Sequence, residues 1–130
     1  MKKIVLLFAL FISLPVLNSF AQEKNSKVPP VRLGNIETNT ATCEQILSFP
    51  RLLVMNPTCV VKSFTMTFIP KGQYLAGPYK TEGPALTDAE IALIKKYKGT
   101  ATKIVIEDIK VSCQGGPETT ANTIFLSYDH

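Results

Sequence analysis

Apolar and polar residues alternate along segment 59–68 in the way that a half-buried antiparallel strand requires. The apolar face of this segment carries Phe64, Met66 and Phe68. Upstream of them the alternation fails, because Cys59 and Val61 would point to the opposite face. One extra residue near Lys62 restores a continuous apolar face, so the pattern predicts a strand with a β-bulge at this position.

A second strand, predicted at 103–113, breaks its alternation in the same way. Its apolar residues are Ile104 and Ile106 on one face, and Ile109, Val111 and Cys113 on the other. An extra residue at Glu107-Asp108 brings all five side chains to one face. We therefore interpret Glu107 and Asp108 as a structural bulge, whose carboxylates bond nearby backbone or pair with a lysine.

The alternative is that these two adjacent carboxylates form a catalytic pair. Neighbours in a regular strand point to opposite faces, but a bulge turns them more nearly the same way, and bulges occur beside active sites. No catalytic motif accompanies them: the sole histidine is His130, and CxxC, HExxH, GxSxG and a phosphate-binding glycine loop are all absent from the sequence. We expect no enzymatic activity, no catalytic residues, no metal site and no cofactor.

Two helices are predicted from their capping signals. Thr87 is followed three residues later by Glu90, which completes a capping box, and Gly99 ends a helix that spans about 87–98. Lysines near the end of this helix complement its negative pole, which gives that basic cluster a structural explanation. The alternative is a phosphate-binding role, which the near-neutral charge of the mature chain disfavours. A second, shorter helix is predicted near 42–48, with Thr42 as its capping residue.

The other periodic segments are short strands separated by turn residues. They are predicted at 31–36, 51–55 and 122–128. Several short strands, one helix in a crossover and the absence of regular βαβ alternation indicate a mainly β protein with the architecture of an antiparallel β-sandwich.

The longest stretch without a clear period, 69–84, is rich in glycine and proline. It is predicted to be a long loop, in which 73–76 could form a short strand. Loops on a rigid scaffold often carry recognition, so we place a partner-contact surface here. Its candidate residues are Lys71, Tyr74, Tyr79 and Lys80. The alternative is a solvated loop whose tyrosines lie on the core.

The first 21 residues have the three parts of a secretory signal peptide. Lys2 and Lys3 precede an apolar run at 4–17, and Ser19-Phe20-Ala21 provides a small-x-small cleavage site. The run is shorter than the roughly 20 residues that a membrane-spanning helix needs. We therefore expect cleavage after Ala21, a periplasmic or secreted protein, and no stable membrane insertion.

Cleavage would leave 109 of the 130 residues. The polar segment 22–30 contains a double proline and is predicted to be a flexible lead-in, followed by a single domain at 31–130. Removal of Lys2 and Lys3 from the 14 basic residues leaves 12 against 10 acidic ones, a net charge of +2. A nucleic-acid partner is therefore not expected.

Three cysteines, Cys43, Cys59 and Cys113, are expected to enter an oxidising compartment, where one disulfide forms and one thiol is left over. Spacing does not choose among the three pairings. We favour Cys43–Cys59, because a short helix followed by a returning strand could bring these two together. Cys113 is then free, or it is the alternative disulfide partner.

Several segments occur in an order that resembles one known family. They are PPVRLGNI, SFTMTF, LTDAEIALIKKYKGTATKIVIEDIKV and NTIFLSY, with a glycine-bearing loop and a Gly-Pro turn between them. They resemble the C-terminal domain of the gliding-motility protein GldM over about 29–128, most strongly at 87–111. The resemblance implies an immunoglobulin-like periplasmic module that contacts outer-membrane-associated partners of the type IX secretion machinery, without catalytic residues.

Unlike that family, the chain is expected to have no transmembrane helix and no upstream periplasmic domains, and its sequence contains three cysteines. We expect a freestanding, exported protein-binding module that resembles this domain, with a partner that the sequence does not identify. The second hypothesis is a β-sandwich that binds a small molecule or glycan through Tyr74 and Tyr79. The third is a hydrolase that uses Glu107 and Asp108.

Overall fold

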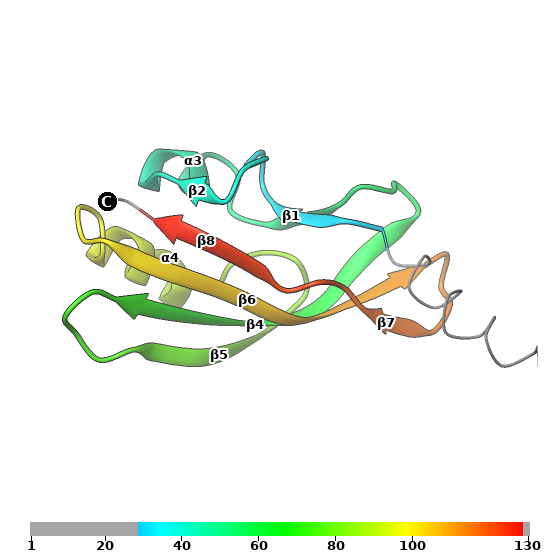
Figure 1. Cartoon of the computed structure of the whole chain (residues 1–130). Coiled ribbons are helices and arrows are strands. Elements are labelled where there is room, and N and C mark those ends of the chain that lie inside the picture. The colour runs from blue at the N-terminus through cyan, green and yellow to red at the C-terminus, as the bar shows by residue number, and fades with distance from the viewer. Residues whose placement is uncertain (1–28, 129–130) are drawn as a thin grey trace, which may run out of the picture.

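The computed structural model describes residues 29–128, which form two β-sheets and two helices (Figure 1). The elements are β1 (Val31–Leu33), β2 (Thr40–Ala41), α3 (Cys43–Ser48), β3 (Leu52–Val54), β4 (Cys59–Pro70), β5 (Ala76–Glu82), α4 (Asp88–Lys96), β6 (Thr102–Cys113), β7 (Glu118–Thr120) and β8 (Ile124–Tyr128). The predicted signal peptide at 1–21, most of the lead-in at 22–30, and His130 lie outside the described residues.

The larger sheet has the strand order β2-β8-β6-β4-β5, and β7 pairs with β6 beyond the end of β8. β2 runs parallel to β8, and the other neighbours are antiparallel. The smaller sheet is the antiparallel pair β1 and β3. β5 and β6 flank β4 on either side, so α4, which connects them, lies in a crossover as predicted. The structure is mainly β and sandwich-like, with two sheets.

One face of the larger sheet, the covered face, carries the hydrophobic core. Its fully buried strand residues include Phe64, Met66, Phe68, Ile104, Ile106, Ile109, Val111 and Tyr128. α4 packs here: the Phe68 and Tyr97 ring centroids are 6.0 Å apart, and the Tyr128 hydroxyl donates a hydrogen bond to the Ile94 carbonyl. Leu33 of β1 belongs to the same core. The opposite, open face remains accessible, with 66% of Phe125 exposed.

The ladder between β4 and β6 shifts register at both places where the alternation breaks. The pairs around the shifts are Val61–Val111, Ser63–Lys110 and Thr65–Glu107. β4 therefore has one extra residue at Lys62, and β6 has one extra residue at Asp108. As a result Ile106 and Ile109, three positions apart, are both fully buried in one core.

The bulge on β6 also affects the neighbouring chain. Asp108 has φ of 52°, and its carboxylate lies 3.0 Å from the Lys110 ammonium. Across from the bulge the Ala121 amide donates to the Ile109 carbonyl at 2.8 Å, between the ends of β7 and β8. The single last strand predicted at 122–128 is therefore preceded by a separate short strand, because the bulge interrupts pairing on this side as well.

The backbone at Asp108 leads to a testable prediction. Asp108→Gly is expected to change the free energy of unfolding by less than about 1 kcal/mol, because glycine adopts positive φ readily and the exposed ion pair contributes little. Asp108→Val is expected to lower it by about 2 kcal/mol, because a β-branched residue is strained in this conformation. Urea denaturation of both variants checks this, with Glu107→Val as the neighbouring control. Equal stability of the Gly and Val variants would contradict the assigned backbone.

Both helices begin with a reciprocal capping box. In α4 the Glu90 amide donates to Thr87 Oγ1 at 3.2 Å, and the Thr87 amide donates to the Glu90 carboxyl group at 2.8 Å. Thr42 and Gln45 make the equivalent pair of bonds in α3. Both helices begin directly after the predicted capping threonine, because these side chains satisfy amides that otherwise lack a partner.

An exposed ion pair joins the two helical segments at the surface. The Lys98 ammonium donates to the Glu44 carboxylate at 2.9 Å and lowers the pKa of that carboxyl group below its ordinary value. A lowered pKa in the folded state means that this contribution to stability is present above the unfolded-state pKa and is lost as the pH falls.

Segment 76–82 corrects the prediction of one long loop, because it forms β5. Gly77 has φ of 116°, and a Cβ on it would approach the Met66 carbonyl oxygen to 2.9 Å, so glycine permits the close pairing with β4. Pro78 is tolerated because β5 is an edge strand, where one missing backbone donor is acceptable. These two residues are typical of loops, and here they belong to an irregular edge strand.

Candidate functional site

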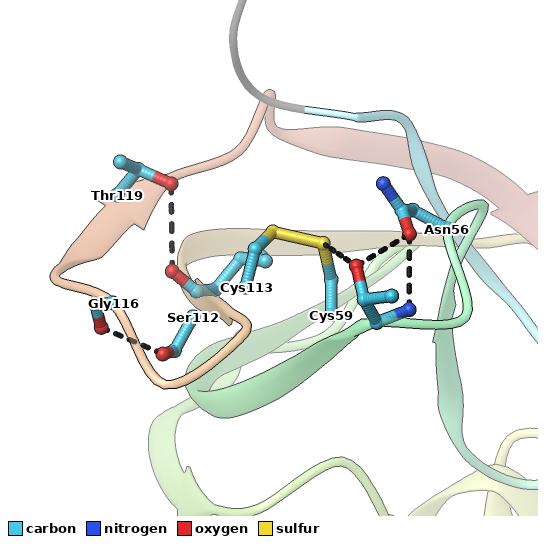
Figure 2. Close-up of a disulfide and its surroundings, with 8 residues drawn as sticks. Asn56, Cys59, Ser112, Cys113, Gly116 and Thr119 are labelled. Carbon is cyan, nitrogen blue, oxygen red and sulfur yellow. Dashed lines mark hydrogen bonds between the residues drawn. A yellow bond between two sulfur atoms is a disulfide. The ribbon is translucent and has the colours of Figure 1, made fainter.

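The disulfide joins Cys59 and Cys113 (Figure 2). Cys43 is a buried free thiol. The favoured Cys43–Cys59 pairing is therefore wrong. Cys59 begins β4 and Cys113 ends β6, and the ladder places them directly opposite each other with Cα atoms 3.9 Å apart. Antiparallel pairing of the two long predicted strands was the signal that could have identified this bond.

Polar side chains tie the turns beside the disulfide (Figure 2). The Asn56 side-chain oxygen accepts from the Thr58 amide at 2.9 Å and from the Thr58 hydroxyl at 2.8 Å. On the other strand, the Ser112 hydroxyl donates to the Gly116 carbonyl at 2.8 Å. These bonds have a structural explanation, since they order the turns that enter β4 and leave β6.

The four predicted contact residues do not form one surface. Lys71 and Tyr74 lie in the turn between β4 and β5, whereas Tyr79 and Lys80 lie within β5. Tyr79 pairs with the buried Met66 and therefore points toward the covered side of the sheet. Lys80, the next residue, points to the open side, so β5 separates two side chains that the sequence analysis groups together.

The turn 71–75, which we call the hairpin tip, is anchored to the rest of the domain. The Lys71 amide donates to the Ala101 carbonyl at 2.8 Å, and the Gln73 amide donates to the Pro70 carbonyl at 3.3 Å. Tyr74 is nevertheless 96% exposed, and Leu75 is 57% exposed. A large aromatic side chain thus lies outside the core on a turn whose first residue is bonded to a neighbouring segment.

An open depression of about 740 Å³ lies between the hairpin tip and the end of α4. Its walls are made by Gly72, Gln73, Tyr74, Lys96 and Tyr97. The Lys96 ammonium is 5.5 Å from the centroid of the Tyr97 ring, within the range of a cation–π contact. The lining contributes aromatic, amide and basic groups and no carboxylate, which favours a neutral or acidic ligand.

Only Tyr74 of this lining is among the predicted contact residues, and the other four, Gly72, Gln73, Lys96 and Tyr97, are not. Lys96 is more than twenty positions from the hairpin tip along the chain, and its place at the end of a helix suffices to explain a basic residue there. Only the crossover packing of α4 brings it beside Tyr74. The hairpin tip can be recognised in the sequence, because Tyr74 lies in a segment rich in glycine and proline.

Glu107 and Asp108 are both exposed on β6. Asp108 is engaged by Lys110, which agrees with the lysine pairing expected of a structural bulge. Within residues 29–128, no group of three His, Cys, Asp or Glu side chains is placed to hold a metal ion.

The fold and the site define a small, mainly β, disulfide-bonded protein with an exposed aromatic hairpin tip. Neither helix in the described range, 29–128, is long and apolar enough to cross a membrane. No model of a known protein family matches the chain. No match to a curated protein is found either.

Proposed function

We propose that the protein is an exported, non-enzymatic module that binds a protein partner in the cell envelope through its hairpin tip. The observation that carries this proposal is Tyr74, which is almost entirely exposed on a turn that is bonded to Ala101 at Lys71 and closed internally by the Gln73–Pro70 bond. Tyrosine is enriched at protein interfaces, where it buries a large area at a small cost in side-chain entropy.

The charges around the tip specify the kind of partner. Lys71 is exposed on the tip, and Lys96 lines the adjoining depression. We propose a partner that presents an acidic or polar segment, with an apolar contact for Tyr74 and Leu75. Complementary charges at the rim of such an interface mainly raise the association rate, so binding is expected to weaken as the salt concentration rises.

The resemblance of the sequence to the C-terminal domain of GldM supports the same class of function. On this proposal the domain is an immunoglobulin-like periplasmic or secreted module, and its partner belongs to the gliding or type IX secretion machinery. The disulfide is in keeping with an oxidising compartment. Tyr79 and Lys80 would contribute at the side of the hairpin rather than at the tip.

Site-specific cross-linking tests the proposal. A photoreactive phenylalanine analogue at Tyr74, in protein expressed in its own cells, is expected to yield one recurrent cross-linked envelope protein. The matched control carries the same group at Phe125, an exposed aromatic position on the open face. Absence of a cross-linked protein, or the same products from both positions, would count against the tip as the binding site.

Substitution of Tyr74 gives the corresponding quantitative prediction. Tyr74→Ser is expected to weaken binding of the cross-linked partner by roughly tenfold or more, the effect of losing a central aromatic contact. Phe125→Ser is expected to leave the affinity unchanged within about twofold. Titration by calorimetry measures both, and circular dichroism checks that the fold is retained.

The depression supports a second candidate function, binding of a glycan or small molecule. Its volume of about 740 Å³ is in the usual range for ligand sites, and the Tyr74 ring and the Gln73 amide can offer stacking and hydrogen bonding. Screening envelope glycans for a rise in melting temperature tests this function. A rise that Tyr74→Ser abolishes would favour it, and a flat response with a confirmed protein cross-link would exclude it.

A further inference from the structure

β5 is a free edge of the larger sheet. It pairs with β4 on one side, and no described strand lies along its other side (Figure 1). Tyr79, Lys80 and Glu82 are exposed, whereas Thr81 is buried by contact with α4. An edge of this kind presents unpaired backbone groups that can pair with another strand.

In segment YKTEG, 79–83, Lys80 and Glu82 lie at equal distances on either side of Thr81. A second, antiparallel copy of the segment therefore places opposite charges against each other. We propose that two copies of the chain pair antiparallel along β5, about a two-fold axis at Thr81, so that their larger sheets join into one. Lys80 and Glu82 stand two positions apart and therefore point to the same, open face. The two-fold axis places Lys80 of each copy opposite Glu82 of the other, which makes two cross-strand ion pairs.

The end of this edge leaves room for the pairing. β5 ends at Glu82, and Gly83 forms a bend with φ of 85° outside the strand. The same axis brings Tyr79 of one copy beside this bend of the other. A Cβ on Gly83 would meet nothing within 4 Å, so the bend does not obstruct the Tyr79 ring.

The structure also limits the length of the pairing. Pro78 has no backbone donor, and the Gly83 amide is already bonded to the Lys62 carbonyl at 2.7 Å. Alternate residues of a strand direct their backbone groups to the same side, so only about two of residues 79–82 in each copy can form new ladder bonds, which indicates a weak, concentration-dependent dimer of the transient class. An unpaired lysine on an edge strand opposes pairing with another strand, but here Lys80 of each copy lies opposite Glu82 of the other.

Charge reversal tests this arrangement on the intact, disulfide-bonded protein. Sedimentation equilibrium between about 10 μM and about 1 mM is expected to show reversible dimerisation. Lys80→Glu places two glutamates opposite each other in both pairs, and Glu82→Lys places two lysines there, so each variant is expected to dimerise at least about tenfold more weakly. An equimolar mixture of the two variants is expected to recover dimerisation, because every cross-strand pair is then Glu–Lys.

Lys103→Glu is the matched control, because it makes the same charge change on the open face of β6, away from the edge. It is expected to dimerise like the wild type. A wild type that stays monomeric at about 1 mM, a Lys80→Glu variant that dimerises normally, or a mixture that stays monomeric would each overturn the proposal. It goes beyond the proposed partner binding, which centres on Tyr74 and shares only Tyr79 and Lys80 with this edge. Tyr74→Ser should therefore leave self-association intact.

Discussion

Replacement of both Cys59 and Cys113 by alanine is expected to lower the free energy of unfolding by about 4 kcal/mol. The disulfide closes a loop with a sequence separation of 54, and closing a loop of that length removes much of the conformational freedom of the unfolded chain. Guanidinium denaturation followed by circular dichroism measures the change. The transition of the double variant should move to a much lower denaturant concentration.

Two controls isolate the disulfide from the loss of buried side chains. Wild-type protein in a reducing agent should unfold at nearly the same denaturant concentration as the double variant. Cys43→Ala, which removes the buried thiol but keeps the bond, should cost only about 1 kcal/mol. Unchanged stability of the double variant, or rapid alkylation of Cys59 in the unreduced wild type, would contradict the Cys59–Cys113 bond.

Glu90→Ala is expected to destabilise the fold by about 3 kcal/mol. The Glu90 side chain is fully buried, and it accepts hydrogen bonds from the Thr81 hydroxyl at 2.6 Å and from the Thr87 amide at 2.8 Å. Its removal leaves both donors without their present acceptor, opens a cavity between α4 and β5, and deletes half of the capping box. Thermal unfolding by calorimetry measures the loss.

Two further variants separate these contributions. Thr81→Val removes the buried hydroxyl but keeps the volume, and it is expected to cost about 1–2 kcal/mol. Asp88→Ala removes an exposed acidic residue from the same first turn and should cost about 0.5 kcal/mol. If Glu90→Ala is no more harmful than Asp88→Ala, Glu90 does not link the helix to the edge strand.

The features that follow from local signals agree with the structure. The two capping threonines start both helices, and the broken alternation of two strands locates both bulges, at Lys62 and at Asp108. These signals are readable because a cap involves residues three positions apart, and because a buried face demands a continuous row of apolar side chains.

The features that could not be predicted are those that depend on contacts between residues far apart in the sequence. β2 has only two residues and exists through its parallel pairing with β8, so no local pattern marks it. β5 contains a glycine and a proline, and α4 covers part of one of its faces, which hides the usual alternation. The site at the hairpin tip is predicted only at Tyr74, because the sequence does not show that the end of α4 lies beside it.

The two bulges stand on opposite strands, and their effects on register cancel. β4 and β6 each contain 12 residues, and the ladder that begins at Pro70–Thr102 ends at Cys59–Cys113 with no net offset. Deletion of one residue from either strand would move the cysteines out of opposition and turn half of that strand's apolar side chains away from the core. Only matched length changes in both strands preserve the opposed cysteines and the continuous apolar face. The lengths of β4 and β6 should therefore change together in evolution.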